Sequence, residues 1–82
     1  MVDEKFANFS IFIKEKATKL GDFKEYDDKA RLTKMIHAYV KPAFALGQVT
    51  AVSDSMCDLI GITDCCDRKR VSRYLEFFAQ AL

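Results

Sequence analysis

Four cationic residues lie within six positions near the C-terminus: Arg68, Lys69, Arg70 and Arg73. An arginine on the exposed face of a helix can donate two parallel hydrogen bonds to a guanine edge or to phosphate oxygens. Ser72 lies inside the same run and can donate a further hydrogen bond to a phosphate. These five residues are therefore the candidate DNA contacts of the chain.

The segment from Val52 to Phe78 carries a pattern of residue types that surrounds this cluster. Cys57 is a small residue four positions before Gly61, the aliphatic Ile62 follows directly, and Val71 comes near the start of a polar-capped stretch. In these features the segment, about a third of the chain, resembles the helix-turn-helix family of DNA-binding segments. The resemblance implies that the second of two packed helices contacts DNA.

The segment departs from this family in its turn. The family usually has about six residues between the turn glycine and the buried aliphatic of the second helix, whereas ten positions separate Gly61 from Val71. The inserted stretch from Asp64 to Asp67 either lengthens the turn or adds a helical turn ahead of the DNA-contacting surface. Its two aspartates would lie near the phosphates if the helix entered a groove by its N-terminal end.

A solvated helix face is the alternative role for the same cations. Asp67 and Glu76 stand at helical spacing from the arginines and could pair with them. The chain would then be a protein-binding inhibitor or adaptor of the kind that phages and plasmids encode, with exposed aromatics against its partner. Phe12 and Phe77 fall off the main apolar stripes and are the candidates for that contact. The other place for both rings is the edge of the core, under lysine stems.

Three cysteines and one histidine are the remaining reactive side chains. Cys57, Cys65, Cys66 and His37 are ligand types of a zinc site, but adjacent cysteines lack the two-residue gap that turns both thiolates toward one ion. We therefore expect no metal or other cofactor. Cys57 is expected in the core, with one member of the vicinal pair buried at a helix start. If the other is exposed there, the helix N-terminus would lower its thiol pKa and make it redox-active.

Patterns typical of catalysis are missing from the sequence. His37 lies between Ile36 and Ala38 in an expected helix, where a surface or core role is more common than that of a general base. Asp27 and Asp28 would point about 100° apart on a helix and could not easily share a proton or a metal. Phosphate-binding glycine loops and nucleophile elbows are also absent. We expect a protein that is not an enzyme.

The composition is typical of one folded domain. Half of the 82 residues are hydrophobic and 30% are charged, which suits a single core spanning residues 1–82. Thirteen Lys and Arg against twelve Asp and Glu leave a formal charge of +1, so no overall field attracts nucleic acid or an anionic membrane. The odd cysteine count, the charged start and the short apolar runs favour a cytoplasmic protein without membrane insertion.

Helices must position these side chains, because apolar residues recur at three- and four-residue steps along the chain. The first predicted helix covers residues 3–20 and ends at Gly21. The second begins at Asp22, which forms a capping-box variant with Glu25, and it runs to Val40.

Pro42 is expected to break the second helix, because proline lacks a donor and disfavours helical geometry at the preceding residue. A short continuation then reaches Gly47. Thr50 or Ser53 is expected to cap a third helix that ends at Gly61. The predicted apolar members of this third helix are Val52, Met56, Leu59 and Ile60.

The last predicted helix is capped by Thr63 or Asp64 and runs to the C-terminus. Its apolar face carries Val71, Tyr74, Leu75, Phe78 and Leu82, with Lys69, Arg73 and Gln80 opposite. Strand signals are lacking throughout. The sequence thus predicts an all-α fold, a compact bundle of four to five helices whose last two form the helix-turn-helix-like unit.

The favoured function at this point is that of a small regulator of transcription or replication. It would bind DNA through the C-terminal helix, and as a homodimer, because one module of this size offers few contacts. The protein-binding inhibitor or adaptor is the alternative. In that case the basic cluster is a solvated face or a docking patch for an acidic partner.

Overall fold

The computed structural model describes residues 2–16 and 28–82, and every regular element within these ranges is a helix. The elements are α1 (Val2–Lys16), α2 (Lys29–Met35), the π-helical turn η2 (Ile36–Val40), α3 (Lys41–Ala45), α4 (Val49–Ile60) and α5 (Cys65–Ala81). The all-α bundle predicted from the sequence is confirmed. The predicted stop at Gly21 and the capping box of Asp22 and Glu25 lie outside the described residues. No helix of the described ranges is long and apolar enough to span a bilayer.

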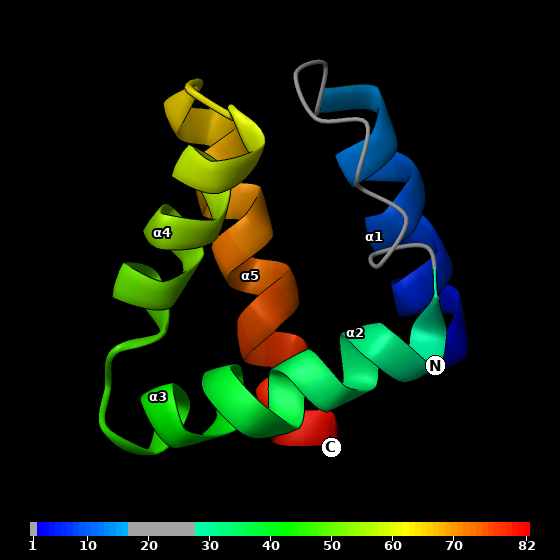
Figure 1. Ribbon diagram of the computed structural model, residues 1–82, viewed down its shortest axis with the longest axis vertical. Helices are drawn as coiled ribbons and strands as arrows, with labels where there is room; N and C mark the ends of the chain where they lie inside the picture. The colour runs from blue at the N-terminus through cyan, green and yellow to red at the C-terminus, as the bar shows by residue number, and fades with distance from the viewer. Residues whose placement is uncertain (1, 17–27) are drawn as a thin grey trace.

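Helix α5 is the centre of the bundle, because it packs against α1, η2, α3 and α4. Figure 1 shows α5 running back beside α4, with α1 on its other side. The side chains of Val71, Leu75 and Phe78 have no exposed surface. They follow one another at steps of four and three residues, so they form one face of the helix. This confirms the apolar stripe predicted for the last helix.

Aromatic rings join α1 to α5. Phe6 stacks on Phe78 with ring centroids 4.4 Å apart, and Phe9 meets Phe78 edge-on at 5.7 Å and Tyr74 at 5.0 Å. Phe6 and Phe9 are three residues apart, so one face of α1 presents both rings to the same partner. Each such pair contributes about 0.5–1.5 kcal/mol beyond the area that it buries.

The helix does not break at Pro42, and this corrects the sequence prediction. Helices α2, η2 and α3 follow one another without a gap, and Lys41, directly before the proline, keeps right-handed helical angles. The backbone N–H of Lys41 donates to the carbonyl of Ile36, five residues earlier, which is the bonding of a π-turn. The wide turn leaves room for the proline ring beside the preceding carbonyl groups, so the helix can continue past a residue that usually ends it.

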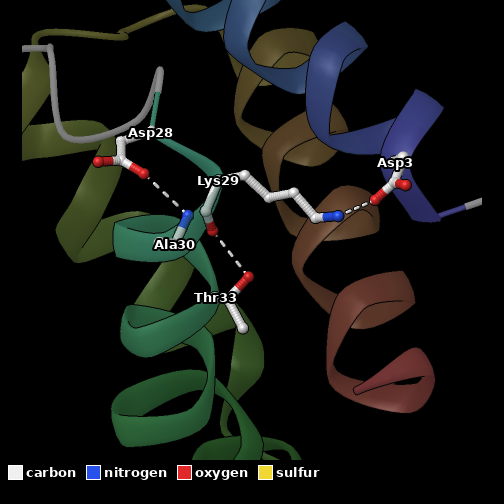
Figure 2. A network of polar contacts seen from close by, with 5 residues as sticks. All are labelled: Asp3, Asp28, Lys29, Ala30 and Thr33. Carbon is white, nitrogen blue, oxygen red and sulfur yellow. Dashed lines mark hydrogen bonds and ion pairs between the residues drawn. The ribbon is translucent and has the colours of Figure 1, made fainter.

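Asp28 starts helix α2. Its backbone is extended and its carboxylate accepts a hydrogen bond from the N–H of Ala30 at 2.9 Å, as expected for an N-cap residue. Figure 2 shows this cap beside two further contacts: Lys29 forms an ion pair with Asp3 of α1, and the Thr33 hydroxyl donates to the Lys29 carbonyl at 2.7 Å. The ion pair is exposed, so it contributes little to stability.

Helix α4 begins earlier than predicted. Its N-cap is Gln48, which makes no side-chain capping bond, and neither Thr50 nor Ser53 has that role. Gly47, with a φ of 69°, turns the chain so that Val49 enters the core at once and is only 4% exposed. Burial of Val49 therefore sets the start of this helix, and Ser53 lies buried in its middle.

The turn between α4 and α5 follows the prediction. Gly61 has a φ of 82°, and the N–H of the buried Ile62 donates to the Cys57 carbonyl at 2.9 Å, so the chain folds back on the last turn of α4. Asp64 then caps α5 by accepting from the N–H groups of Cys66 and Asp67 at 2.8 and 3.1 Å. This short connection sets α5 against α4.

Candidate functional site

Arg68 is half-buried against α4 and the turn that follows it. Its guanidinium forms an ion pair with Asp58, lies 3.7 Å from an Asp54 carboxylate oxygen, and donates to the Ile62 carbonyl at 3.0 Å. The hydrogen bond to Asp58 raises the pKa of Arg68 above its already high ordinary value. Arg68 therefore ties α5 to α4, and its donors face these internal partners.

The other predicted DNA contacts lie further round α5. Lys69, Arg70 and Arg73 are exposed and Ser72 is half-buried. Lys69 and Arg73 are four residues apart and line a depression with Thr50 of α4. The same depression also contains the carboxylates of Asp54 and Glu76, so its charge is mixed. Of the five predicted residues, Arg68 is paired with α4, and Lys69, Arg70 and Arg73 form an exposed cationic row. Ser72 is half-buried.

The predicted ion pairs along α5 are replaced by a longer-range contact. Asp67 lies 3.6 Å from Lys16 of α1, so α1 supplies its cation and not an arginine of its own helix. The stretch from Asp64 to Asp67 adds helix ahead of the cations, since Asp64 is the cap and Cys65 is the first helical residue. The alternative of a longer turn is therefore wrong.

Phe12 is not exposed, and this corrects the prediction of an aromatic patch there. Its side chain is 2% exposed, and the Arg70 guanidinium lies over its ring at 4.3 Å from the centroid. Phe77 is half-buried against the core, with the Lys5 ammonium 5.5 Å from its ring centroid. Both rings flank the core under cationic side chains, as in the alternative weighed from the sequence.

The cysteines do not gather into a reactive centre. Cys57 is buried as predicted, and burial raises its thiol pKa. Cys65 and Cys66 are both exposed, so the prediction that one of them is buried is wrong. The charge of the neighbouring Cys65 is the main cause that raises the pKa of the Cys66 thiol, and the Asp64 carboxylate is the second. This direction is opposite to the lowering expected at a helix N-terminus. Among the described residues, no group of three His, Cys, Asp or Glu side chains could hold a metal ion.

A groove lies between the continuous helical segment α2–η2 and α4. It has a volume of about 740 Å³, within the range of roughly 300–1,000 Å³ that ligand sites occupy. Most of its lining is apolar: Leu32, Met35, Ala38, Tyr39, Ala51, Val52 and Met56, with Ser55, Arg31 and Lys34. The mostly apolar lining suits this groove to binding apolar side chains.

Two large side chains extend the apolar surface at this groove. Tyr39, from the π-turn, is 67% exposed. Leu59 is also 67% exposed, and it lies three residues after Met56 and seven after Val52, which places all three on one face of α4. Leu59 was predicted as one of the apolar members of this helix, and the structure places it at the surface while Met56 and Ile60 are buried. Tyr39 lines the groove, and Leu59 lies further along α4, beyond the residues that line it.

Sequence patterns alone did not reveal the groove. Val52 and Met56 were identified as apolar members of one helix, but the opposite wall comes from Met35, Ala38 and Tyr39, more than ten residues away. The π-turn changes which residues of this wall face outward, and periodicity at 3.6 residues does not predict it. The signal that could have been used is the surplus of apolar residues over what a single stripe can hold.

The chain matches no protein-family model, no curated protein and no solved structure.

Proposed function

We propose that this protein is a protein-binding regulator, an inhibitor or adaptor, whose groove between α2–η2 and α4 receives the apolar face of an amphipathic helix from a partner protein. The proposal rests on the apolar groove, on the exposed Tyr39 in its wall and on the exposed Leu59 further along α4. Binding a helix in a groove between two helices is a recurring mode of protein recognition.

The energetics favour a partner with large apolar side chains. Fully burying a side chain such as Leu59 is worth about 1.5–3 kcal/mol. The gain from two or three such residues can offset part of the ordering cost of association. Met35 and Met56 line the groove, and unbranched thioether chains can adjust to the shape of an incoming side chain. An aliphatic or aromatic stripe at helical spacing is therefore the complementary surface.

Arginine substitutions at Ala38 and Ala51 are expected to block the groove. Both alanines are exposed and line it from opposite walls, so a long charged side chain fills the groove while helix propensity stays favourable. With a labelled model peptide that forms a leucine-rich amphipathic helix, each variant should bind at least about tenfold more weakly than the unchanged protein. Fluorescence anisotropy gives the affinity, and NMR chemical-shift changes locate the peptide.

The matched control is Ala7→Arg, because Ala7 is an exposed helical alanine of α1 outside the groove. This variant should bind the peptide like the unchanged protein, and circular dichroism should show equal helix content in all three variants. Peptide-induced shifts that avoid the residues lining the groove, or equal binding by Ala38→Arg, would contradict the proposal.

A nucleic-acid-binding regulator is the second candidate function. The exposed row of Lys69, Arg70 and Arg73 on α5, with Lys5 beside Arg70 and Arg73 in a small hollow, favours it. It ranks below protein binding because Arg68 is occupied by α4 and because α5 lies between α1 and α4. A homodimer would supply the contacts that one copy lacks.

Duplex DNA titrated at increasing salt separates the two functions. Binding through α5 should weaken steeply with salt and should be lost in the double variant Arg70→Ala, Arg73→Ala. The groove variant Ala38→Arg should leave DNA binding unchanged. Affinity that is insensitive to salt and to both arginine substitutions would exclude α5 as a nucleic-acid surface.

A further inference from the structure

The charges around the groove are arranged asymmetrically. Among the described residues that line it, the charged ones are Arg31 and Lys34, and both belong to α2. The α4 wall, formed by Ala51, Val52, Ser55 and Met56, carries no charge. One side of the groove is therefore cationic and the other is neutral.

Helix α4 contributes no anion to the groove because its carboxylates face α5. Asp54 and Asp58 both contact Arg68, at 3.7 Å and in a direct ion pair. They stand two and six residues after Val52, about 200° and 240° round the helix from it. The contacts of Asp54 and Asp58 with Arg68 therefore also keep negative charge away from the groove.

The two cations of α2 are available to a partner. Arg31 has a side chain that is 65% exposed, and its contact with Asp28 measures 3.9 Å, close to the limit for an ion pair. Lys34 is exposed, and within the described parts of the chain it forms no ion pair. The two residues are three apart, so they stand about one helical turn from each other on the same side of α2.

We infer that the partner helix is acidic along one flank, with two carboxylates one turn apart beside its apolar stripe, and that Arg31 and Lys34 select it. This inference rests on the proposed function, since it specifies the occupant of the same groove. An antiparallel or parallel partner can satisfy it, because the two cations and the two carboxylates share the spacing of one turn. A flank of the opposite sign would meet like charge at the α2 wall and would be rejected.

Three model peptides with one leucine stripe and different flanks test the inference. The flank positions carry glutamate, glutamine or lysine, and anisotropy gives the affinity of each for the full chain. Binding should decrease in the order glutamate, glutamine, lysine by about fivefold per step, as expected for two solvent-exposed charge pairs. The differences should shrink when salt is raised.

Charge reversal on the protein supplies the decisive variant. Arg31→Glu with Lys34→Glu should invert the order, so that the lysine-flanked peptide binds best. Lys69→Glu is the control, because Lys69 is an exposed lysine of α5 outside this groove, and it should leave the order unchanged. Because both substituted residues are exposed, circular dichroism should report the same fold for every variant.

The outcomes distinguish the two levels of the proposal. Equal groove binding by all three peptides would overturn the acidic flank and leave the proposed function in place. No groove binding by any peptide would overturn both. A dimer in sedimentation that Ala38→Arg converts to monomer would show that a second copy occupies the groove, and would also overturn the inference.

Discussion

Replacing Phe78 by alanine is expected to lower the free energy of unfolding by about 3–5 kcal/mol, the usual cost of removing a buried phenylalanine. Phe78 has no exposed surface and its ring contacts those of Phe6, Phe9 and Phe77. The substitution leaves a cavity where α1 meets α5, and α5 is the helix that packs against α1, η2, α3 and α4. A domain with roughly 5–15 kcal/mol of stability would lose a large part of it.

Urea denaturation followed by circular dichroism measures this loss. Phe44→Ala is the matched control, because Phe44 is 39% exposed and the same atoms are removed near the surface; it should cost less than about 1 kcal/mol. Equal midpoints for the two variants would show that the ring cluster does not dominate the core. The slope of the transition should stay unchanged if both variants unfold from the same compact state.

Replacing Asp64 by alanine is expected to destabilise the protein by about 1–2 kcal/mol, which is the upper range for losing an N-cap side chain. The Asp64 carboxylate accepts from two backbone N–H groups, those of Cys66 and Asp67, and both lose this acceptor in the variant. Because α5 is central, fraying of its first turn also loosens the contacts of Asp67 and Arg68 with neighbouring helices. Thermal and urea unfolding both report the change.

Asp64→Asn is the control for this cap, because an asparagine oxygen can accept the same hydrogen bonds. Its loss of unfolding free energy should be only a small fraction of that in Asp64→Ala. Gln48 offers the reverse experiment. It caps α4 without a side-chain bond, so Gln48→Asp should raise stability by about 0.5–1 kcal/mol if the new carboxylate reaches the free N–H groups. Unchanged stability in Asp64→Ala would show that solvent satisfies the N–H groups of Cys66 and Asp67 equally well.

The strongest local signals in the sequence predicted the structure well. The stripe of Phe6, Phe9 and Ile13 is buried, as is that of Val71, Leu75 and Phe78. Gly61 ends α4 with a positive φ, and Asp64 caps α5. These features depend on neighbours within one or two turns, which is the range over which helical periodicity and capping act.

Features that depend on tertiary packing were predicted poorly. Pro42 stands inside a continuous helical segment because the π-turn before it makes room. Ser53, one of the two expected caps, is buried in α4, whereas Leu59, one of the predicted apolar members of this helix, is exposed. For Ser53 and Leu59, the packing of α4 against its neighbours overrides the local preference of the residue.

The candidate site, too, could be predicted from the sequence only in part. The cationic row of Lys69, Arg70 and Arg73 was recognised from composition, but the occupation of Arg68 by Asp54 and Asp58 requires α4 to lie beside α5. These residues are ten or more positions apart. The groove, too, exists only once α2–η2 and α4 are placed together. Charge and hydropathy in a single segment therefore identified surface residues without identifying which of them have partners.

The π-turn at Ile36–Val40 shows where this protein can vary in length. It accommodates one residue more than a regular helix would need over the same distance. Deleting a single residue there would restore ordinary winding, and the helix beyond the turn would keep its register. Val40 and Ala43 would then stay in the core, while Tyr39 would change its place in the groove wall. Homologous chains that lack one residue in this stretch should therefore keep the core and present a groove of different shape.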